Sequence, residues 1–261
     1  MQIDLELTWT LLVLLVSIRL GVVFFASPFD ALGRLPARVR VFSALGLSVV
    51  LVSALGLATI ELPGSLLSFG LLAASEALVG LMLAFGFYAA FGSIMVAGKL
   101  LDFQAGFGAA QILNPTTNAA NPLFGTVLAL FAVVIFFTSD AYLVAIRGLS
   151  WSLQVLPPGA GILPDALHGI VAQFGVTYLY GIIIAAPVIG ALLLLDTGIA
   201  VLGRSMPQMN VYFLFLPLKI FAALALVMVA LRYLAPVLEQ LFLGVFKYWQ
   251  LTLMQPPVSI G

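Results

Sequence analysis

The sequence predicts an all-α, polytopic membrane protein, and three observations lead there. Of 261 residues, 63% are apolar and only 8% are charged, and the mean hydropathy is +1.23. Soluble domains carry about 25% charged residues, so no soluble fold could bury this much apolar surface. The apolar residues also gather in runs long enough to span a bilayer, which takes about 20 residues in a helix. Because lipid offers no hydrogen-bond partner to free backbone groups, these runs are expected to be helices.

Six apolar regions predict the membrane-spanning helices, in order along the chain: residues 7–28, 41–60, 66–97, 123–146, 169–202 and 213–235. The first follows Asp4 and Glu6, unlike the basic start of a cleaved signal peptide, so it is expected to be retained as a helix. Prolines and glycines within 148–166 predict an external loop. The stretch 236–254 is expected to form a separate helix that packs on an assembly or lies at an interface.

Basic loop residues predict the orientation of these spans. With the N-terminus outside, five basic loop residues lie on the cytoplasmic side and two on the external side. The cytoplasmic five are Arg34, Arg38, Arg40, Lys99 and Arg204, and the external two are Arg147 and Lys247.

Composition excludes several classes of function. A formal net charge of zero argues against nucleic acid as a partner. The absence of cysteine removes thiolate chemistry and zinc–sulfur sites. His168 is the sole histidine and is expected to cap a helix or face solvent. Because no catalytic or phosphate-binding motif is present, the chain is expected to be no enzyme, with no catalytic residue, cofactor or metal.

The segment 99–122 is the first candidate functional stretch. It is long for a segment without regular structure, and such loops tend to be functional or disordered. Gly106 and Gly108 flank Phe107, which gives a pliable backbone around one bulky ring. This construction suits a movable plug in a pore, and it also fits a surface loop between helices. The candidate plug residues are Gly106, Phe107, Gly108, Gln111, Ile112, Leu113, Asn114 and Pro115.

The segment 203–219, GRSMPQMNVYFLFLPLK, is the second candidate. Pro207 ends a helix, so the chain is expected to reverse there as a helical hairpin. A plain cytoplasmic turn explains the proline and the polarity. A turn that binds partner proteins would use the residues Arg204, Pro207, Gln208, Met209 and Asn210.

The order of Arg204, Pro207-Gln208-Met209-Asn210 and Pro217-Leu218 resembles the signature of the flagellar FliR family, whose counterparts serve virulence injectisomes. The first segment is similar too: Asp102-Phe103-Gln104 precedes Gly106-Phe107-Gly108-Ala109. Asn114-Pro115 stands where the family has Asp-Pro, which loses a charge but keeps the turn-forming character. The resemblance covers nearly the whole chain, and the string MPQMN favours flagellar over injectisome use.

This resemblance implies a core subunit of the flagellar type III export gate at the bacterial inner membrane. With FliP and FliQ it would form the pore for unfolded flagellar subunits, and FlhB and FlhA would complete the apparatus. It also implies steep helical hairpins in a heteromeric assembly, partly displaced toward the periplasm. Residues 1–166 would be FliP-like and residues 167–261 FliQ-like. A small-solute channel or secondary transporter is the alternative, although Pro187 has no counterpart in the third region.

Charges within or beside the apolar regions form a last group of candidates. The acidic ones are Glu76, Asp102, Asp140 and Asp196, and each could be a functional carboxylate, an ion-pair partner or a helix-end residue. Asp102 is expected to pair locally with Lys99. Arg19 and Lys219 lie near predicted cytoplasmic ends, so they are expected to snorkel toward water without a carboxylate partner.

Overall fold

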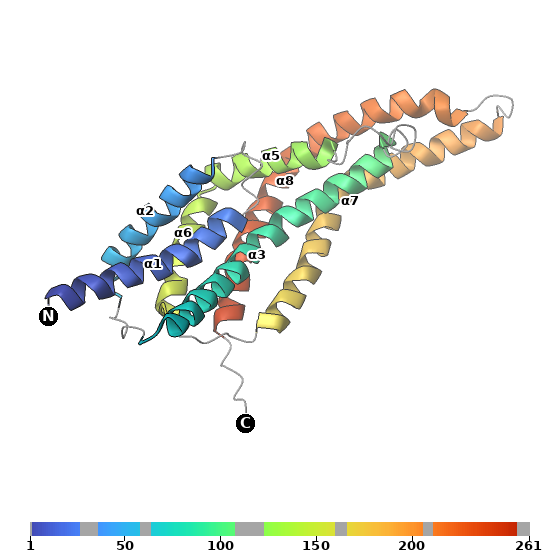
Figure 1. Cartoon of the computed structure of the whole chain (residues 1–261). Coiled ribbons are helices and arrows are strands. Elements are labelled where there is room, and N and C mark those ends of the chain that lie inside the picture. Colours follow the sequence, from blue (N-terminus) through green and yellow to red (C-terminus); the bar gives the residue numbers. More distant parts are fainter. Residues whose placement is uncertain are drawn as a thin grey trace. The chain divides into compact units, whose positions relative to one another are not determined.

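The computed structural model describes residues 2–26, 36–57, 64–107, 123–159, 166–205 and 211–254. These residues form helices joined by turns, and no strand occurs among them (Figure 1). The helices are α1 (Gln2–Ala26), α2 (Ala37–Leu55), α3 (Leu66–Ala105), α5 (Leu123–Thr138), α6 (Ala141–Val155), α7 (Ala166–Ser205) and α8 (Val211–Leu253).

Five of these helices are long and apolar enough to cross a membrane, namely α1, α2, α3, α7 and α8. The shorter helices α5 and α6 are separated by a short break, and as a pair they would make a sixth, broken span. The prediction of an all-α, polytopic membrane fold is therefore confirmed, and within the described residues each of the six apolar regions is mostly helical.

Three boundaries differ from the sequence prediction. The region 123–146 is broken at Ser139 and Asp140, and Asp140 has a φ of 58°. Aspartate tolerates this left-handed conformation better than most residues, so it can end one helix and begin another. Helix α6 also takes in the first half of the predicted external loop, and the stretch expected to be a separate C-terminal helix is the last part of α8.

Pro217 and Pro236 both lie inside α8, although proline usually ends a helix. In apolar surroundings a break would expose further backbone groups with nothing to bond to. The helix therefore continues through both prolines.

The chain divides into two compact units, each built from segments distant in sequence. The first consists of Met1–Ala90, Phe137–Gly175 and Phe242–Gly261, and the second of Phe91–Phe136 and Val176–Leu241. Helices α3, α7 and α8 contribute residues to both. The proposed division into residues 1–166 and 167–261 is of another kind, since it rests on likeness to other proteins, and it stays a prediction.

Trp249 of α8 organises the core of the first unit, where it is 1% exposed. Its indole Nε1–H donates to the Leu83 carbonyl of α3 at 3.0 Å, and its ring lies edge-on to Phe87. Gly86 of α3 and Gly148 of α6 leave the space that the indole fills. A small residue at Gly86 thus allows α3 to pack closely on α8.

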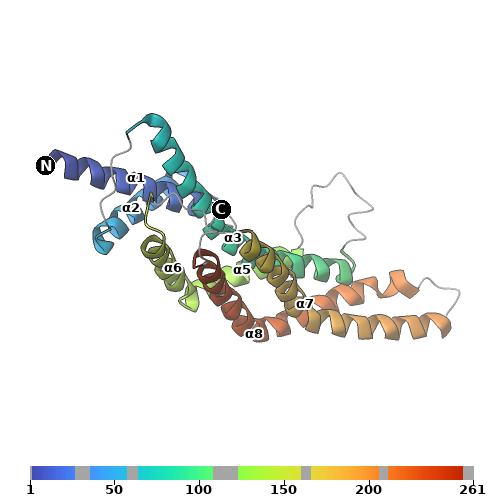
Figure 2. The same ribbon diagram turned by 90° about the horizontal axis from the view of Figure 1, so that it is seen from below.

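In the second unit, the later part of α7 and the beginning of α8 run side by side as a hairpin (Figures 1 and 2). This confirms the predicted reversal of the chain between residues 203 and 219. Helix α3 packs on α7 at Gly181, where an added Cβ would lie 3.1 Å from the Ser93 carbonyl oxygen. Gly190, further along α7, has open space beside it.

Candidate functional site

The structure describes part of each candidate segment. Gly106 and Phe107 come directly after the end of α3, and the other candidate plug residues lie outside the described residues: Gly108, Gln111, Ile112, Leu113, Asn114 and Pro115. Arg204 is exposed near the end of α7. The remaining turn residues also lie outside the described part of the chain: Pro207, Gln208, Met209 and Asn210.

Helix α3 extends through Lys99 to Ala105, so residues 99–105 of the predicted loop 99–122 are helical. Helix α3 precedes the candidate plug segment and helix α5 follows it, and the backbones of the two helices are in contact. A Cβ added at Gly98 would overlap the Gly125 Cα and backbone nitrogen. Only glycine permits so close an approach. The two ends of the candidate plug segment are therefore held together at its base.

Asp102 of α3 also joins the two helices, by binding the N-terminus of α5. Its Oδ1 accepts a hydrogen bond from the backbone N–H of Phe124, the second residue of α5, at 3.2 Å. The first N–H groups of a helix lack partners within the helix and carry partial positive charge, so a carboxylate satisfies them well. Its Oδ2 is buried and has no hydrogen-bond partner among the described residues.

The predicted local pair between Lys99 and Asp102 is wrong. Lys99 is exposed, whereas Asp102 is 6% exposed and turned to the start of α5. The backbone N–H groups at the start of α5 have no partner within the helix. They therefore compete better for the buried Asp102 carboxylate than the solvated Lys99 ammonium does.

Gly106 and Phe107 complete this junction. Gly106 has a φ of 96°, a conformation that side chains other than glycine adopt only under strain. It turns the chain sharply as α3 ends, close against the Leu216 side chain of α8. Phe107 then meets Phe124 edge-on, with ring centroids 5.8 Å apart. The predicted pliable glycine at 106 is therefore a required turn, and the aromatic ring at 107 packs on α5.

A cluster of polar side chains joins α3, α7 and α8 nearby. Lys219 of α8 pairs with Asp196 of α7, with its Nζ 2.7 Å from Oδ1 and 2.9 Å from Oδ2. Gln104 of α3 donates from Nε2 to the same Oδ2 at 2.9 Å. The Lys219 side chain is 8% exposed and that of Asp196 is 33% exposed. The expectation that Lys219 snorkels without a carboxylate partner is wrong, because Asp196 stands opposite it in the hairpin.

The first unit holds a second, more deeply buried pair. Arg19 of α1 donates from Nε to Glu76 of α3 at 2.6 Å, and the side chains are 0% and 2% exposed. The remaining guanidinium nitrogens bond the carbonyls of Ser152 and Leu156 at the C-terminal end of α6. The other Glu76 oxygen accepts the Gly159 N–H at 2.9 Å.

Snorkelling is therefore the wrong account of Arg19 as well. Carbonyls at the C-terminal end of a helix carry partial negative charge and can accept further hydrogen bonds, so they are favourable partners for a buried guanidinium. Arg19 joins α1, α3 and the end of α6 at one point.

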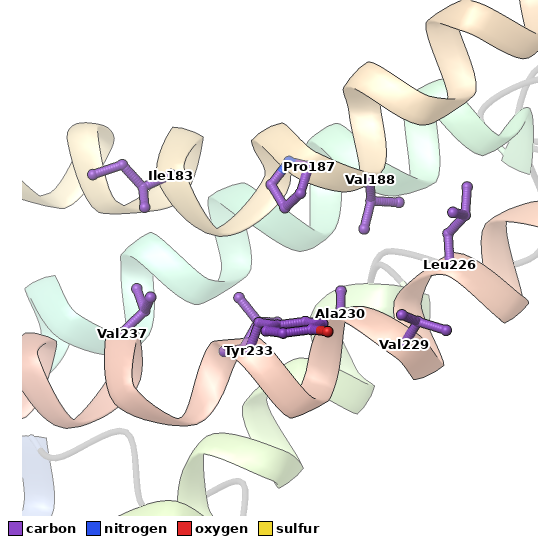
Figure 3. Close-up of a pocket in the computed structure, with 9 residues that line it drawn as sticks. Ile183, Pro187, Val188, Leu226, Val229, Ala230, Tyr233 and Val237 are labelled. Carbon is purple, nitrogen blue, oxygen red and sulfur yellow. The ribbon is translucent and has the colours of Figure 1, made fainter.

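A cavity of about 350 Å³ lies between α7 and α8 in the second unit (Figure 3). Side chains from both helices face it, and among its lining residues only Tyr233 carries a polar group. They are Ile183, Pro187, Val188, Leu226, Val229, Ala230, Tyr233, Leu234 and Val237. This lining suits an apolar occupant and offers no acid or base for chemistry.

Sequence reasoning missed the cluster at Asp196, although a signal for it was present. Asp196 lies twelve residues before position 208, the middle of the predicted reversal, and Lys219 lies eleven after it. A helical hairpin places such positions opposite one another. The contribution of Gln104 carried no comparable signal, since it depends on how α3 packs against the hairpin.

Comparison with known proteins places the chain among export proteins. It matches the family described as "Bacterial export proteins, family 1" over residues 10–245. It is 31% identical over 237 residues to the flagellar biosynthetic protein FliR of Bacillus subtilis, covering 88% of this chain and 89% of that protein. It is 25% identical over 224 residues to FliR of Caulobacter vibrioides, covering 85% and 89%.

A shorter match, 35% identical over 124 residues, joins it to the secretion system apparatus protein SsaT of Salmonella typhimurium. That match covers 47% of this chain and 48% of SsaT. The family match, by contrast, includes nearly every described helix, with the α3–α5 junction and both buried ion pairs. The chain therefore belongs to the bacterial export proteins, family 1, and is a multi-pass membrane component of a bacterial export apparatus.

Proposed function

We propose that this chain is a core subunit of the flagellar type III export gate. Together with FliP and FliQ it forms the pore through which unfolded flagellar subunits leave the cytoplasm, and FlhB and FlhA complete the apparatus. The observation that carries this proposal is the match to Bacillus subtilis FliR along 88% of the chain. The match to FliR of Caulobacter vibrioides, over 85% of the chain, also favours flagellar use over an injectisome. On this proposal the chain is structural and has no catalytic residue.

The lengths of the helices support a position partly outside the bilayer of the inner membrane. Helices α3 and α7 have 40 residues each and α8 has 43. At about 1.5 Å per residue each is about 60 Å long, whereas the hydrocarbon core is about 30 Å thick. Steep hairpins that rise from the membrane toward the periplasm, packed on neighbouring subunits, accommodate this excess.

Co-purification tests the proposed role. The chain is expressed with its FliP and FliQ counterparts and extracted in mild detergent. We expect a stable complex with one copy of this chain, and loss of motility when the chain is absent. A monomer or homodimer that moves small solutes in liposomes would instead support the channel or transporter alternative.

The segment 106–115 is proposed to obstruct the closed pore. Support comes from the helices that flank it, because the Gly98–Gly125 contact and the Asp102 hydrogen bond hold α3 and α5 together. Deleting residues 106–115 is expected to leave a complex that assembles but leaks ions. Wild-type tightness in a fully assembled deletion variant would remove the plug role.

The turn 204–210 is proposed to lie on the cytoplasmic side and to seat partner proteins. Arg204 supports this proposal, since its guanidinium is exposed at the end of α7. Replacing Gln208 and Asn210 together with alanine is expected to lower motility and complex yield. Normal values for both would indicate a plain turn.

A further inference from the structure

One carboxylate, Asp196, receives donors from two other helices of the second unit. Lys219 reaches it from α8, next along the chain, at 2.7 and 2.9 Å. Gln104 reaches it from α3, 92 residues away in sequence, at 2.9 Å. The lysine bond is therefore internal to the α7–α8 hairpin, whereas the glutamine bond ties that hairpin to the end of α3.

Gln104 is the polar side chain through which the last turn of α3 reaches α7. Helix α3 ends at Ala105, one residue later. The close packing of α3 on α7 occurs at Val96, which touches Gly181. Eight residues separate Val96 from Gln104, or about 12 Å of helix. Ala105, the last residue of α3, separates Gln104 from Gly106, the first residue of the candidate plug segment.

The two bonds to Asp196 have different consequences when they break. Without Lys219, Asp196 would keep a charge that is two-thirds buried and has only a neutral amide beside it, which is strongly unfavourable. Without Gln104, the ion pair remains intact and no charge is left unpaired. The glutamine bond can therefore open and close while the hairpin stays formed.

We infer that the Gln104–Asp196 hydrogen bond is a releasable latch that holds the last turn of α3 on the α7–α8 hairpin. On the proposed function, on which this consequence rests, release of the latch loosens the base of the plug segment. The ion pair with Lys219 keeps the latch acceptor charged and in place. A hydrogen bond to a charged acceptor is typically strong enough to shift a two-state equilibrium by about tenfold to a hundredfold.

Hydrogen exchange in the assembled complex tests the latch directly. The variants are Gln104→Leu, which removes the donor, and Gln104→Glu, which keeps size and shape but places a second carboxylate against Asp196. Both are expected to raise exchange in residues 99–107 by about tenfold or more, with Gln104→Glu the larger effect. Gln240→Leu is the matched control, because Gln240 is an exposed glutamine on α8.

The contrasting outcomes are distinct. Wild-type protection of residues 99–107 in both Gln104 variants would overturn the latch. Faster exchange in Gln104→Leu alone would also overturn it, since lost packing would then be the cause. Faster exchange in both variants, with none in Gln240→Leu, supports it.

Ion leak through the assembled complex separates the latch from the proposed function. If the 106–115 deletion leaks but the Gln104 variants stay tight and protected, the latch is wrong and the plug stands. If the Gln104 variants exchange faster while even the deletion stays tight, the latch stands and the plug role fails.

Discussion

Removing one member of the buried Arg19–Glu76 pair should be costlier than removing both. Arg19→Leu leaves the Glu76 carboxylate, 2% exposed, with the Gly159 N–H as its one remaining hydrogen bond among the described residues. It also removes the guanidinium donor from the Leu156 carbonyl, whereas the Ser152 carbonyl keeps the Leu156 N–H. Breaking a buried pair from one side typically costs about 3–5 kcal/mol. Glu76→Leu should cost somewhat less, because the guanidinium keeps its carbonyl partners.

The double variant Arg19→Leu/Glu76→Leu removes both charges at once. Only neutral backbone groups then lose a partner, at a cost of about 1–3 kcal/mol. The double variant should therefore be more stable than Arg19→Leu alone, and its cost should fall well below the sum of the two single costs.

Thermal unfolding of the detergent-solubilised complex measures these differences. A loss of about 3–5 kcal/mol corresponds to a fall in Tm on the order of 10 °C for a chain of this size. Glu239→Leu is the matched control, because Glu239 is an exposed glutamate on α8, and it should change Tm little. If Arg19→Leu matched this control, or if the two single effects added, the reasoning from burial would be refuted.

Two further predictions concern the second unit. Gly98→Ala should prevent the close contact of α3 with α5 and severely lower the yield of assembled complex. Gly190→Ala, where nothing lies within 4 Å, should have little effect. Equal yields of the two variants on size-exclusion chromatography would contradict the importance of the Gly98–Gly125 contact. Lys219→Arg should preserve export, since it keeps the positive charge opposite Asp196, while Lys219→Leu should lower the yield of complex. A fully assembled Lys219→Arg complex that exports nothing would show a specific need for the lysine ammonium.

The helices themselves could be predicted well from the sequence. Lipid leaves the backbone no partner outside the chain, so a long apolar run has almost no alternative to a helix. The same reason explains the errors at helix ends. A rule that holds in water makes Pro236 a helix boundary, yet α8 continues through it. The charge of Lys99 suggests a loop residue, yet Lys99 is exposed on the surface of α3.

The site was harder to predict, because its residues meet only through packing between distant helices. Glycine positions along α3 indicated close contacts, but not that Gly98 would face Gly125. A flexible backbone was expected at Gly106, whereas the structure shows a turn there with a φ of 96°, a conformation that favours glycine. The second donor to Asp196, Gln104, has no periodic or motif signal, since a lone glutamine near a helix end fits many surroundings.

The buried charges show how this fold resolves the conflict between charge and lipid. Considered singly, each basic residue near a helix end is expected to reach toward water. The structure instead places Arg19 against Glu76 and the end of α6, and Lys219 against Asp196. Asp102 meets the start of α5. Each charge thus faces an opposite charge or an opposite helix end, which offsets the loss of hydration.

Such partners must come from other helices, so each charge also fixes how helices are arranged. A leucine in place of Arg19 could slide along α3, but the guanidinium has bonds only where Glu76 and the Leu156 carbonyl coincide. This makes the polar residues of an export subunit useful for specifying its packing, whatever their net contribution to stability. It also explains why the bond from the neutral amide of Gln104 is the one suited to opening: it sets a position without leaving an unpaired charge behind when it breaks.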